Sequence, residues 1–378
     1  MNISFLAFGE PFPNYHASYV HISEKMGAVS GLGHRVNIFA RPVDNDSGMI
    51  GKKFADRKNY KVTYVIFPKY KKIQNPLHFR RSREVVLKGS LDADLFHERY
   101  YSEFYSTSIV KELKKPYIIE MNNPVAEEIS NPLLRRLVAH VRDKKLAACD
   151  AVITQTATLK NIISGFTDKP VHVVPNGVNN SYFSGKSDFL RRTQHIGKND
   201  KIITFVGAFR PWHGINQVSE IVERVVEQNP DVKFVFVGGG EIKMRRFSEK
   251  VILIPQLKYP DVVKCLLSSD ILIAPFDTSR YSYLEKHGFW WSPVKLYEYM
   301  AAGKPIVSYD YKEVRNIVGN AGLLAKPFDT EGFSKNILKL AESESVRRKL
   351  GKNAKRLAAG YDWKIRAKQT VKVYESII

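Results

Sequence analysis

The segment Ser292-Pro-Val-Lys-Leu-Tyr-Glu-Tyr-Met-Ala-Ala-Gly-Lys-Pro-Ile-Val307 decides the fold. Its apolar residues recur at helical spacing, which predicts a helix that buries one face. These residues are Leu296, Tyr297, Met300 and Ala301. Gly303 predicts the end of this helix, and the residues after it predict a buried strand. Glu298 lies one turn into the helix, where a carboxylate can reach a ligand hydroxyl. An ordinary helix-to-strand unit with a surface glutamate explains the same pattern.

Strand-like and helical segments alternate along the chain, and this pattern occurs twice. The strands predicted in the first half are Ile3–Phe8, Arg35–Ala40, Lys61–Phe67, Asp94–His97, Tyr117–Glu120, Ala151–Thr154 and Val171–Val174, with helices over 16–31, 102–114 and 156–165. After a polar stretch beyond Gly185, further strands are predicted at Ile202–Val206, Lys233–Val237, Val251–Ile254, Ile271–Ala274 and Ile306–Ser308, with a helix over 215–228. Such alternation predicts a parallel sheet in each half.

The predicted fold class is therefore α/β, with two Rossmann-like, doubly wound domains that face each other across a cleft. The predicted domains span residues 1–180 and 181–360, followed by a closing segment over 361–378. Ligands of such folds lie at the carboxyl ends of the strands, so the cleft is the expected site.

The composition is that of an ordinary globular protein. The chain has 378 residues, of which 44% are hydrophobic and 26% are charged. Cys149 and Cys265 lie far apart and form no metal or redox motif, which favours a reducing compartment. The N-terminal apolar run lacks a basic region before it and predicts a first strand, not a signal peptide. No apolar run is long enough to span a bilayer. These features predict a cytoplasmic protein.

The net charge of +21 suggests an anionic partner. Basic residues dominate the segment from Lys52 to Lys88, and a second cluster lies within 133–145 among leucines and valines. The second segment predicts an amphipathic helix that could lie on the inner face of an anionic membrane. Its aliphatic residues are equally explained as part of the core. Nucleic acid is not predicted as a partner, because no recognition motif or aromatic platform accompanies the charge.

Glycines follow several predicted strands, and these positions predict the binding of a phosphate-containing ligand. Gly9 and Gly207 each follow the first strand of a half, and Gly238, Gly239 and Gly240 follow another strand. Glycine lets the backbone approach a bulky ligand, and the free N–H groups of such loops bind phosphate oxygens. Arg210, just after Gly207, could offer a bidentate fork to phosphate, although it could also be a solvated surface residue.

Taken together, these segments resemble a known family. The whole chain is similar to retaining glycosyltransferases of the GT-B fold, family 4. The resemblance is carried, in order, by Gly33-His-Arg-Val36, Val174-Pro-Asn-Gly-Val178, Phe205-Val-Gly-Ala-Phe-Arg-Pro-Trp-His-Gly214, Phe236-Val-Gly-Gly-Gly240, the segment 292–307, Ala321-Gly-Leu-Leu-Ala-Lys-Pro327 and Tyr361-Asp-Trp-Lys364. The last of these resembles the start of the family's closing helix, which crosses back onto the first domain.

The resemblance implies a sugar-nucleotide donor bound by the second domain. Glu298 matches the second glutamate of the family's paired-glutamate motif, which usually binds ribose hydroxyls. The first glutamate would fall at Trp290, so it is missing. Instead, the segment from Ser292 through Val294 to Lys295 resembles a variant subgroup in which the lysine reaches phosphate or sugar. The family's usual arginine and lysine align with Ala208 and His213, which leaves Arg210 and His213 as the expected substitutes.

The acceptor side of the resemblance also departs from the family. Asn122 occupies a position where many relatives carry a histidine, so Glu120 or Glu98 is expected to polarise an acceptor hydroxyl. His97 is expected to be a satisfied strand-end residue. No cofactor is predicted besides the donor substrate, and no metal site. The pairs Asp44/Asp46 and Asp92/Asp94 are interpreted as turn or capping residues.

The resemblance implies transfer with retention of configuration, by front-face attack assisted by the leaving diphosphate. A covalent intermediate would require a carboxylate beside the anomeric carbon, and the sequence offers no strong candidate. The acceptor is expected to be a hydroxyl in glycan, glycolipid or cell-surface polysaccharide synthesis, with a lipid-linked acceptor favoured by the basic first half. Two alternatives stay open: a GT-B epimerase that acts on a sugar nucleotide alone, and a basic protein that binds nucleic acid or membranes without catalysis.

Overall fold

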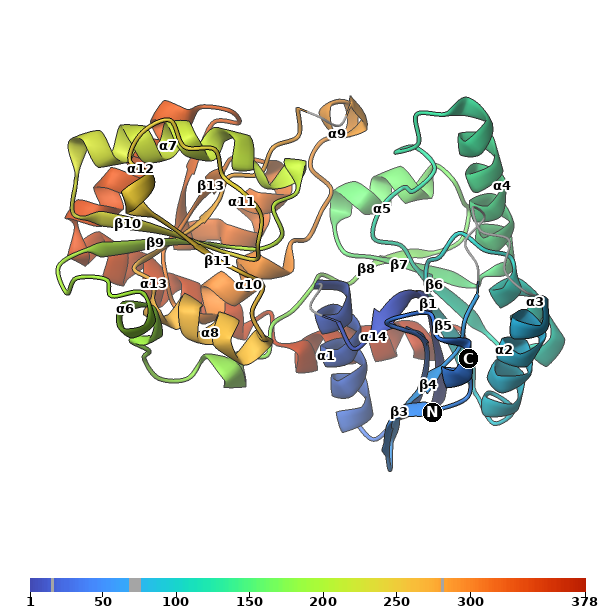
Figure 1. Ribbon diagram of the computed structural model, residues 1–378. Helices are drawn as coiled ribbons and strands as arrows, with labels where there is room; N and C mark the ends of the chain where they lie inside the picture. Colours follow the sequence, from blue (N-terminus) through green and yellow to red (C-terminus); the bar gives the residue numbers. More distant parts are fainter. Residues whose placement is uncertain (15–16, 68–75, 280–281) are drawn as a thin grey trace. The chain divides into compact units, whose positions relative to one another are not determined.

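The computed structural model describes residues 1–14, 17–67, 76–279 and 282–378, and the chain forms two compact units (Figure 1). The first unit contains Met1–Pro175 together with Trp363–Ile378, and the second contains Asn176–Asp362. The division lies at 175/176, whereas the sequence analysis placed it at 180. Among the described residues, none of the helices combines the length and the apolar composition needed to cross a bilayer.

The sheet of the first unit has the strand order β3-β4-β2-β1-β5-β6-β7-β8. Its strands are β1 (Asn2–Phe12), β2 (Arg35–Pro42), β3 (Lys53–Arg57), β4 (Tyr60–Tyr64), β5 (Leu95–Arg99), β6 (Tyr117–Glu120), β7 (Ala151–Thr154) and β8 (Val171–Val173). Neighbouring strands pair in parallel except at one edge, and Ile3 of β1 pairs with both Val36 of β2 and Leu95 of β5. The predicted strands are confirmed, with shifted ends.

Three features of this sheet differ from the expectations. The edge strand β3 was not predicted, and it pairs antiparallel with β4, so the sheet is not wholly parallel. A strand this polar carries no apolar run to reveal it, and a short turn can join it to β4 as a hairpin. Gly9 lies within β1 and does not follow it, at a register shift between Ala7 and Pro11. The residues 68–75, which hold part of the first basic cluster, lie outside the described residues.

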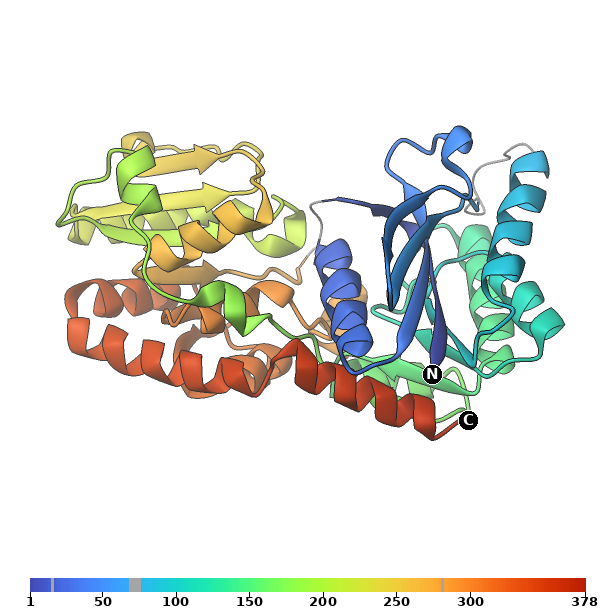
Figure 2. The same cartoon turned by 90° about the horizontal axis from the view of Figure 1, so that it is seen from below.

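Helices cover both faces of the first sheet (Figure 2). The helices α2 (Pro76–Gly89), α3 (Tyr105–Leu113) and α4 (Pro132–Ala148) cover one face, and α5 (Ala157–Ser164) connects β7 to β8. The helices α1 (Ala17–Gly31) and α14 (Trp363–Glu375) pack against each other on the opposite face. There Ile22 and Met26 of α1 share a buried core with Phe5 of β1 and Tyr374 of α14. The closing segment thus packs onto the first unit, as the resemblance implied.

The sheet of the second unit is parallel, with the strand order β11-β10-β9-β12-β13-β14. Its strands are β9 (Lys201–Val206), β10 (Val232–Val237), β11 (Val251–Ile254), β12 (Ile271–Ala274), β13 (Ile306–Tyr309) and β14 (Gly322–Ala325). The strands predicted in this half are confirmed, and β14 is an addition. Its sequence, Gly-Leu-Leu-Ala, is too short for periodicity to distinguish a strand from a helix.

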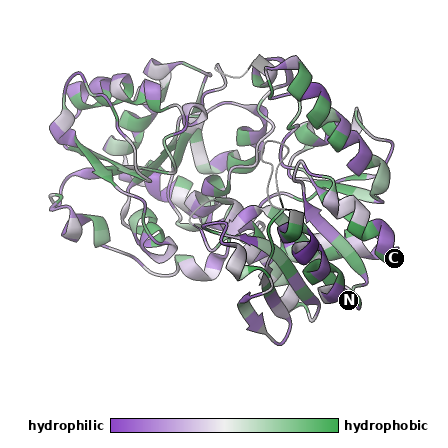
Figure 3. Ribbon diagram, turned by 45° about the vertical axis from the view of Figure 1, so that its right-hand side comes forward, coloured by the Kyte–Doolittle hydropathy of each residue, from purple (hydrophilic) through white to green (hydrophobic). Residues whose placement is uncertain are grey.

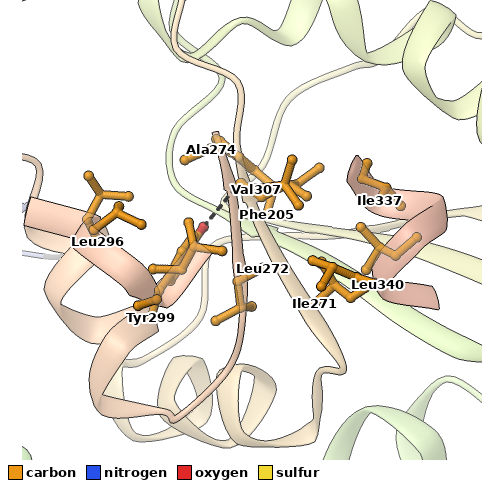
Figure 4. Close-up of a cluster of buried hydrophobic side chains, with 14 of the residues drawn as sticks. Phe205, Ile271, Leu272, Ala274, Leu296, Tyr299, Val307, Ile337 and Leu340 are labelled. Atoms are coloured by element: carbon orange, nitrogen blue, oxygen red, sulfur yellow. Dashed lines mark hydrogen bonds between the residues drawn. The ribbon is translucent and has the colours of Figure 1, made fainter. Parts of the chain in front are cut away.

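Helices flank this second sheet as well. They are α6 (Phe189–Thr193), α7 (Ile215–Gln228), α8 (Tyr259–Ser268), α9 (Ser282–His287), α10 (Val294–Ala301), α11 (Lys312–Val318), α12 (Thr330–Glu342) and α13 (Glu344–Ala359). Figure 4 shows Leu296 and Tyr299 of α10 on one side of β12, and Ile337 and Leu340 of α12 on the other. Apolar residues are concentrated in the strands of both units (Figure 3). This packing fixes α10, which carries the candidate residues described next.

Candidate functional site

Two glycine-containing loops meet at the carboxyl end of β9 and β10 in the second unit. Gly207 follows β9 with a φ of 143°, and Gly238 follows β10 with a φ of 138°, both in the region that disfavours side chains. A Cβ on Gly238 would lie 2.2 Å from the Gly207 carbonyl oxygen, and one on Gly240 would lie 2.4 Å from the Phe209 ring. The two loops are therefore packed as closely as glycine allows.

Lys295, in the first turn of α10, points its ammonium group toward this edge. A Cβ built on Gly207 would lie 2.7 Å from the Lys295 nitrogen. That nitrogen lies 4.2 Å from the ring centre of Phe205 and 5.7 Å from that of Phe276. It is buried, and no hydrogen-bond partner reaches it from the described residues. Burial lowers the pKa of Lys295 from 10.5 to about 7, although Glu298 favours the charged form. The site thus contains a buried ammonium group that no hydrogen-bond acceptor reaches among the described residues.

His213 and Arg210 lie in the segment between β9 and α7. The His213 ring nitrogen Nδ1 makes a short contact with the Ala208 carbonyl oxygen. Burial, together with the nearby ammonium of Lys295, lowers the pKa of His213 to about 3, so the imidazole is neutral at pH 7. Arg210 is exposed, and its backbone caps the short 3₁₀ turn Pro211–His213. Of the two expected substitutes, His213 contributes no positive charge and Arg210 retains one.

The helix α10 is fixed by hydrogen bonds to neighbouring strands. The Tyr299 hydroxyl accepts a hydrogen bond from the Val206 N–H at 2.9 Å and donates one to the Ile273 carbonyl oxygen at 3.3 Å. Before the helix, the Ser292 hydroxyl lies 2.7 Å from that of Tyr297, and the Ser292 carbonyl oxygen accepts a hydrogen bond from the Asn176 side chain at 2.5 Å. These contacts hold the first turn of α10 at the sheet edge.

The predicted carboxylate of this helix is buried. Glu298 lies one turn after the start of α10 at Val294, and its residue is 7% exposed. The position of the missing first glutamate, Trp290, is a core residue that is 1% exposed and packs against Tyr283 and Trp291. An indole ring therefore fills the space at the position that would otherwise hold a second carboxylate.

The second unit contains the residues predicted to bind the donor, apart from Gly9. They are Gly207, Arg210, His213, Gly239, Gly240, Ser292, Val294, Lys295 and Glu298. Contacts bring Gly207, His213 and Lys295 together at one end of the sheet. The N-terminus of α7 lies at the same end, because a Cβ on Gly214 would clash with the Pro275 carbonyl oxygen at 1.6 Å. Backbone N–H groups, a helix N-terminus and a buried cation can together bind a multivalent anion.

The first unit contains a separate polar pocket of about 310 Å³ at the carboxyl ends of its central strands. Its lining includes Gly9, Glu10, Arg99, Tyr100, Tyr101, Ser102, Glu120, Asn122, Asn123, Val125 and Glu128. Glu10 accepts a hydrogen bond from Arg99 at 3.0 Å, and Asn123 donates one to Glu128 at 3.0 Å. A Cβ on Gly9 would lie 2.5 Å from the Tyr101 ring. The predicted Gly9, Glu120 and Asn122 thus line one cavity.

Glu120 forms part of a buried ionic network. Its carboxylate lies 2.6 Å from Lys25, 2.6 Å from His21 and 3.2 Å from His97, and it accepts a hydrogen bond from Gln155 at 2.9 Å. Burial alone would raise the pKa of Glu120, but Lys25 and His21 outweigh it and hold the pKa well below its ordinary value. Glu120 is therefore ionised and strongly hydrogen-bonded.

Glu98 lies in a second buried cluster, outside the lining of this pocket. Both Glu98 and Glu103 lie 2.6 Å from the Lys145 ammonium, and Glu98 also accepts a short hydrogen bond from Tyr117. Arg99 directly follows Glu98 in the sequence and has the opposite charge. In the structure Arg99 pairs instead with Glu10, because alternate residues of β5 point to opposite faces of the sheet.

Several residues of these clusters were missed by the sequence analysis. His21 and Lys25 lie among the buried apolar residues of α1, at a spacing of four that places them on one face. Two polar residues on the apolar side of a helix are a usable signal for a buried network. Glu10 offered no signal, because its pairing with Arg99 depends on strand order.

One aspartate of each Asp-x-Asp pair accepts a hydrogen bond from a backbone N–H group. Asp46 caps the turn at Ser47 by accepting a hydrogen bond from the Gly48 N–H at 2.8 Å. Asp94 accepts one from the Asn2 N–H at 2.7 Å. The Asp46 contact confirms the predicted turn role, whereas Asp94 links the start of β1 to the residue before β5. Cys149 and Cys265 are free and buried.

Comparison with known proteins identifies the family of each unit. The sequence model "Glycosyl transferases group 1" matches residues 186–357, which lie in the second unit. The sequence model "Glycosyltransferase Family 4" matches residues 20–182, most of the first unit. The two matches follow each other along the chain and between them cover most of it.

Relatives and solved structures agree with this assignment. An uncharacterized glycosyltransferase of Methanocaldococcus jannaschii is 22% identical over 295 residues, covering 75% of this chain and 76% of that protein. A phosphatidyl-myo-inositol mannosyltransferase of Mycobacterium leprae is 25% identical over 212 residues, and this match spans 54% of this chain and 53% of the relative.

The solved structures show the fold. The sucrose-phosphate synthase of Thermosynechococcus elongatus superposes with a TM-score of 0.77 at 16% identity, over 99% of this chain and 98% of that one. Anabaena HepE in complex with UDP-glucose superposes with a TM-score of 0.72 at 14% identity over the whole of both chains. The chain is therefore a glycosyltransferase of the GT-B fold, built from a family 4 domain followed by a group 1 domain.

Proposed function

We propose that the protein transfers a sugar from a nucleotide-diphosphate sugar to a hydroxyl acceptor, with retention of configuration and without a metal ion. The observation that carries this proposal is the Lys295 ammonium, which is buried without a hydrogen-bond partner among the described residues. A buried charge is costly unless it is paired. A diphosphate bound beside Gly207 would supply the hydrogen-bond acceptor that this ammonium lacks.

Each group of the second-unit site has a role in this proposal. Lys295 and Arg210 neutralise the diphosphate, and the N–H groups of the loop after Gly207 add hydrogen bonds. Glu298 accepts hydrogen bonds from the ribose hydroxyls, as the resemblance implies. The negative charge that develops as the sugar–phosphate bond breaks is then met by groups already in place. Because these groups supply the positive charge, the proposed reaction needs no divalent cation.

Retention is proposed through attack on the same face from which the diphosphate departs. A double displacement would need a carboxylate beside the anomeric carbon. The position of the family's first glutamate is the buried Trp290, which cannot act as a nucleophile. The leaving phosphate oxygen would then take the proton of the acceptor hydroxyl, so that the new glycosidic bond forms as the old one breaks.

The first unit is proposed to bind the acceptor. The pocket that contains Glu10, Asn122 and Glu128 is lined mainly by polar side chains, which suit a ligand rich in hydroxyl groups. Glu120, at its base, is hydrogen-bonded to Lys25 and His21, so we assign it an electrostatic role and not that of a proton acceptor. We do not assign the polarisation of the acceptor to Glu98, because Lys145 holds Glu98 outside the pocket lining.

The relatives support a sugar-nucleotide donor and a glycan or glycolipid product. The HepE complexes contain UDP and UDP-glucose, and one group of relatives is named for transfer of mannose to phosphatidyl-myo-inositol. We therefore propose a role in glycan, glycolipid or cell-surface polysaccharide synthesis at the cytoplasmic side of a membrane. An acceptor carried by a lipid is the favoured class.

A donor panel tests this proposal. UDP-, GDP- and ADP-sugars are added to the wild type and to Glu298→Gln, and the melting temperature is measured with each. We expect one nucleotide class to raise the melting temperature of the wild type, and this increase to be smaller in the variant. No increase with any donor would contradict the proposal.

The product distinguishes the reaction type. The stabilising donor is incubated with the protein and a mixture of glycoside acceptors, and the products are examined by NMR. We expect a new glycoside whose anomeric configuration equals that of the donor. An inverted product would overturn retention, and an epimerised nucleotide sugar without transfer would favour an epimerase.

A further inference from the structure

The helix α4 changes character along its length. In its second half the basic residues Arg142 and Lys145 are buried, although the sequence suggested a continuous basic face. Arg142 pairs with Glu127 at 2.5 Å and stacks on the Phe166 ring at 3.8 Å, while Lys145 pairs with Glu98. These two cations stabilise the first unit and cannot meet an external partner.

The first half of α4 is different, because its apolar residues are exposed. Leu133 is 78% exposed and Leu137 is 44% exposed. They are four residues apart and lie on one helix face. The aliphatic residues of this segment therefore divide into two groups. Val138 and Val141 are buried in the first unit, whereas the two leucines face outward.

Exposed basic side chains continue the same face. Positions 133, 137, 140 and 144 follow one another at intervals of three or four residues, so His140 and Lys144 extend the stripe of Leu133 and Leu137. Arg136 lies beside it and is also exposed. The acidic residue of α4, Asp143, accepts a hydrogen bond from the buried Arg142 at 2.8 Å and is thereby partly neutralised.

A second helix on the same face of the sheet shows the same combination. Leu77, in the first turn of α2, is 69% exposed, and Arg80 and Arg81 follow it at exposed positions. Both α2 and α4 begin after a parallel strand, so their first turns lie at the end of the sheet that holds the polar pocket. Figure 1 shows both helices on one side of the first unit.

We propose that the first turns of α2 and α4 form a docking surface for an anionic lipid bilayer. The leucines would enter the boundary between headgroups and acyl chains, and the arginines and lysine would contact the headgroup phosphates. The net charge of +21 adds a long-range attraction to the same partner. Charge alone would suit nucleic acid as well, but exposed leucines between the cations suit a bilayer. The docked surface would bring the polar pocket toward a lipid-carried acceptor.

Vesicle binding tests this proposal independently of catalysis. The full chain is sedimented, without nucleotide sugar, with vesicles of phosphatidylcholine alone or with phosphatidylglycerol. The variants are Arg136→Glu with Lys144→Glu, and Leu133→Ser with Leu137→Ser. The charge-matched control is Arg348→Glu with Lys349→Glu, two exposed positions on α13 of the second unit, and the apolar control is Leu253→Ser, 43% exposed on β11. Circular dichroism and the melting temperature verify that each variant is folded.

We expect binding to the anionic vesicles, weakened by high salt, and little binding to phosphatidylcholine. Each basic residue near such a surface contributes about fivefold to partitioning, so the double charge reversal should lower it at least tenfold. The leucine pair should lower it severalfold, and both controls should bind like the wild type. If the charge variant and its control lose vesicle binding equally, the proposed docking surface is overturned. Absence of wild-type binding to the anionic vesicles would also overturn it. If the protein binds RNA through Arg136 and Lys144 but not through the leucines, and does not bind vesicles, the partner of this surface is nucleic acid and the bilayer proposal is overturned. None of these outcomes alters the donor panel, so failure here is distinguishable from failure of the proposed function.

Discussion

Replacing Lys295 with methionine should make the protein more stable, although it removes a residue of the proposed site. Lowering the pKa from 10.5 to about 7 corresponds to on the order of 4 to 5 kcal/mol, because each pKa unit is worth ~1.4 kcal/mol. Methionine fills similar space between Phe205 and Phe276 without a charge. It loses the attraction between the ammonium and the rings, which offsets part of the gain. We expect the free energy of unfolding at pH 7 to rise by on the order of 1 to 3 kcal/mol.

The pH dependence of this effect follows from the direction of the shift. Between pH 7 and 10.5 the unfolded chain holds the Lys295 proton more tightly than the folded chain does, so wild-type stability rises with pH relative to the variant. The advantage of Lys295→Met should therefore be complete below pH 7 and fade toward pH 10.5. Urea denaturation of both proteins from pH 6.5 to 9 measures this difference in the free energy of unfolding. A variant less stable than the wild type at pH 7 would refute the view that this ammonium is a destabilising, unpaired charge.

Three further predictions concern neighbouring groups. Gly207→Ala places a Cβ 2.7 Å from the Lys295 nitrogen, at a backbone φ of 143° that alanine rarely adopts. The affinity for the donor, measured by calorimetry, should therefore fall at least tenfold. Unchanged affinity would argue against a close approach of the donor to Gly207. Donor affinity of the wild type should fall as pH rises above 7, because Lys295 loses its proton in the free protein; a flat profile from pH 6.5 to 9, measured with a sugar nucleotide, would contradict this. Glu120→Gln should lower the free energy of unfolding by about 3 to 5 kcal/mol, because Lys25 then stays buried without its anion. Glu10→Gln, which breaks a partly exposed ion pair, should change the free energy of unfolding by less than about 1 kcal/mol. Similar values for the two variants in urea denaturation would contradict the account.

The segment from Ser292 to Val307 illustrates what the sequence could predict. Its helical periodicity, its glycine and its apolar strand are local properties, and the structure confirms them as α10 and β13. The glycines after β9 and β10 have positive φ angles, which glycine adopts readily, while their binding of phosphate stays a prediction. Polar partners across strands could not be predicted in the same way. The pairing of Glu10 with Arg99 joins residues far apart in the chain, and it depends on β1 and β5 being neighbours.

The helix α4 shows where periodicity is insufficient. The sequence allowed a basic, membrane-facing helix or a helix whose aliphatic face is core, and the structure shows each in a different half. Leucines at 133 and 137 and valines at 138 and 141 have similar hydrophobicity, so composition cannot tell which of them the sheet covers. Likewise, burial of Arg142 and Lys145 depends on acidic partners outside the helix.

Equilibrium binding of the donor to the wild type and to Lys295→Met tests the central claim most directly. Isothermal titration calorimetry at pH 7 would use the sugar nucleotide that stabilises the wild type in the donor panel. A charge-assisted hydrogen bond contributes about 1.5 to 3 kcal/mol, so the dissociation constant of the variant should be roughly 10- to 150-fold higher. That loss, in a protein more stable than the wild type, would support Lys295 as the cation that receives the diphosphate. Equal dissociation constants for the two proteins would contradict it.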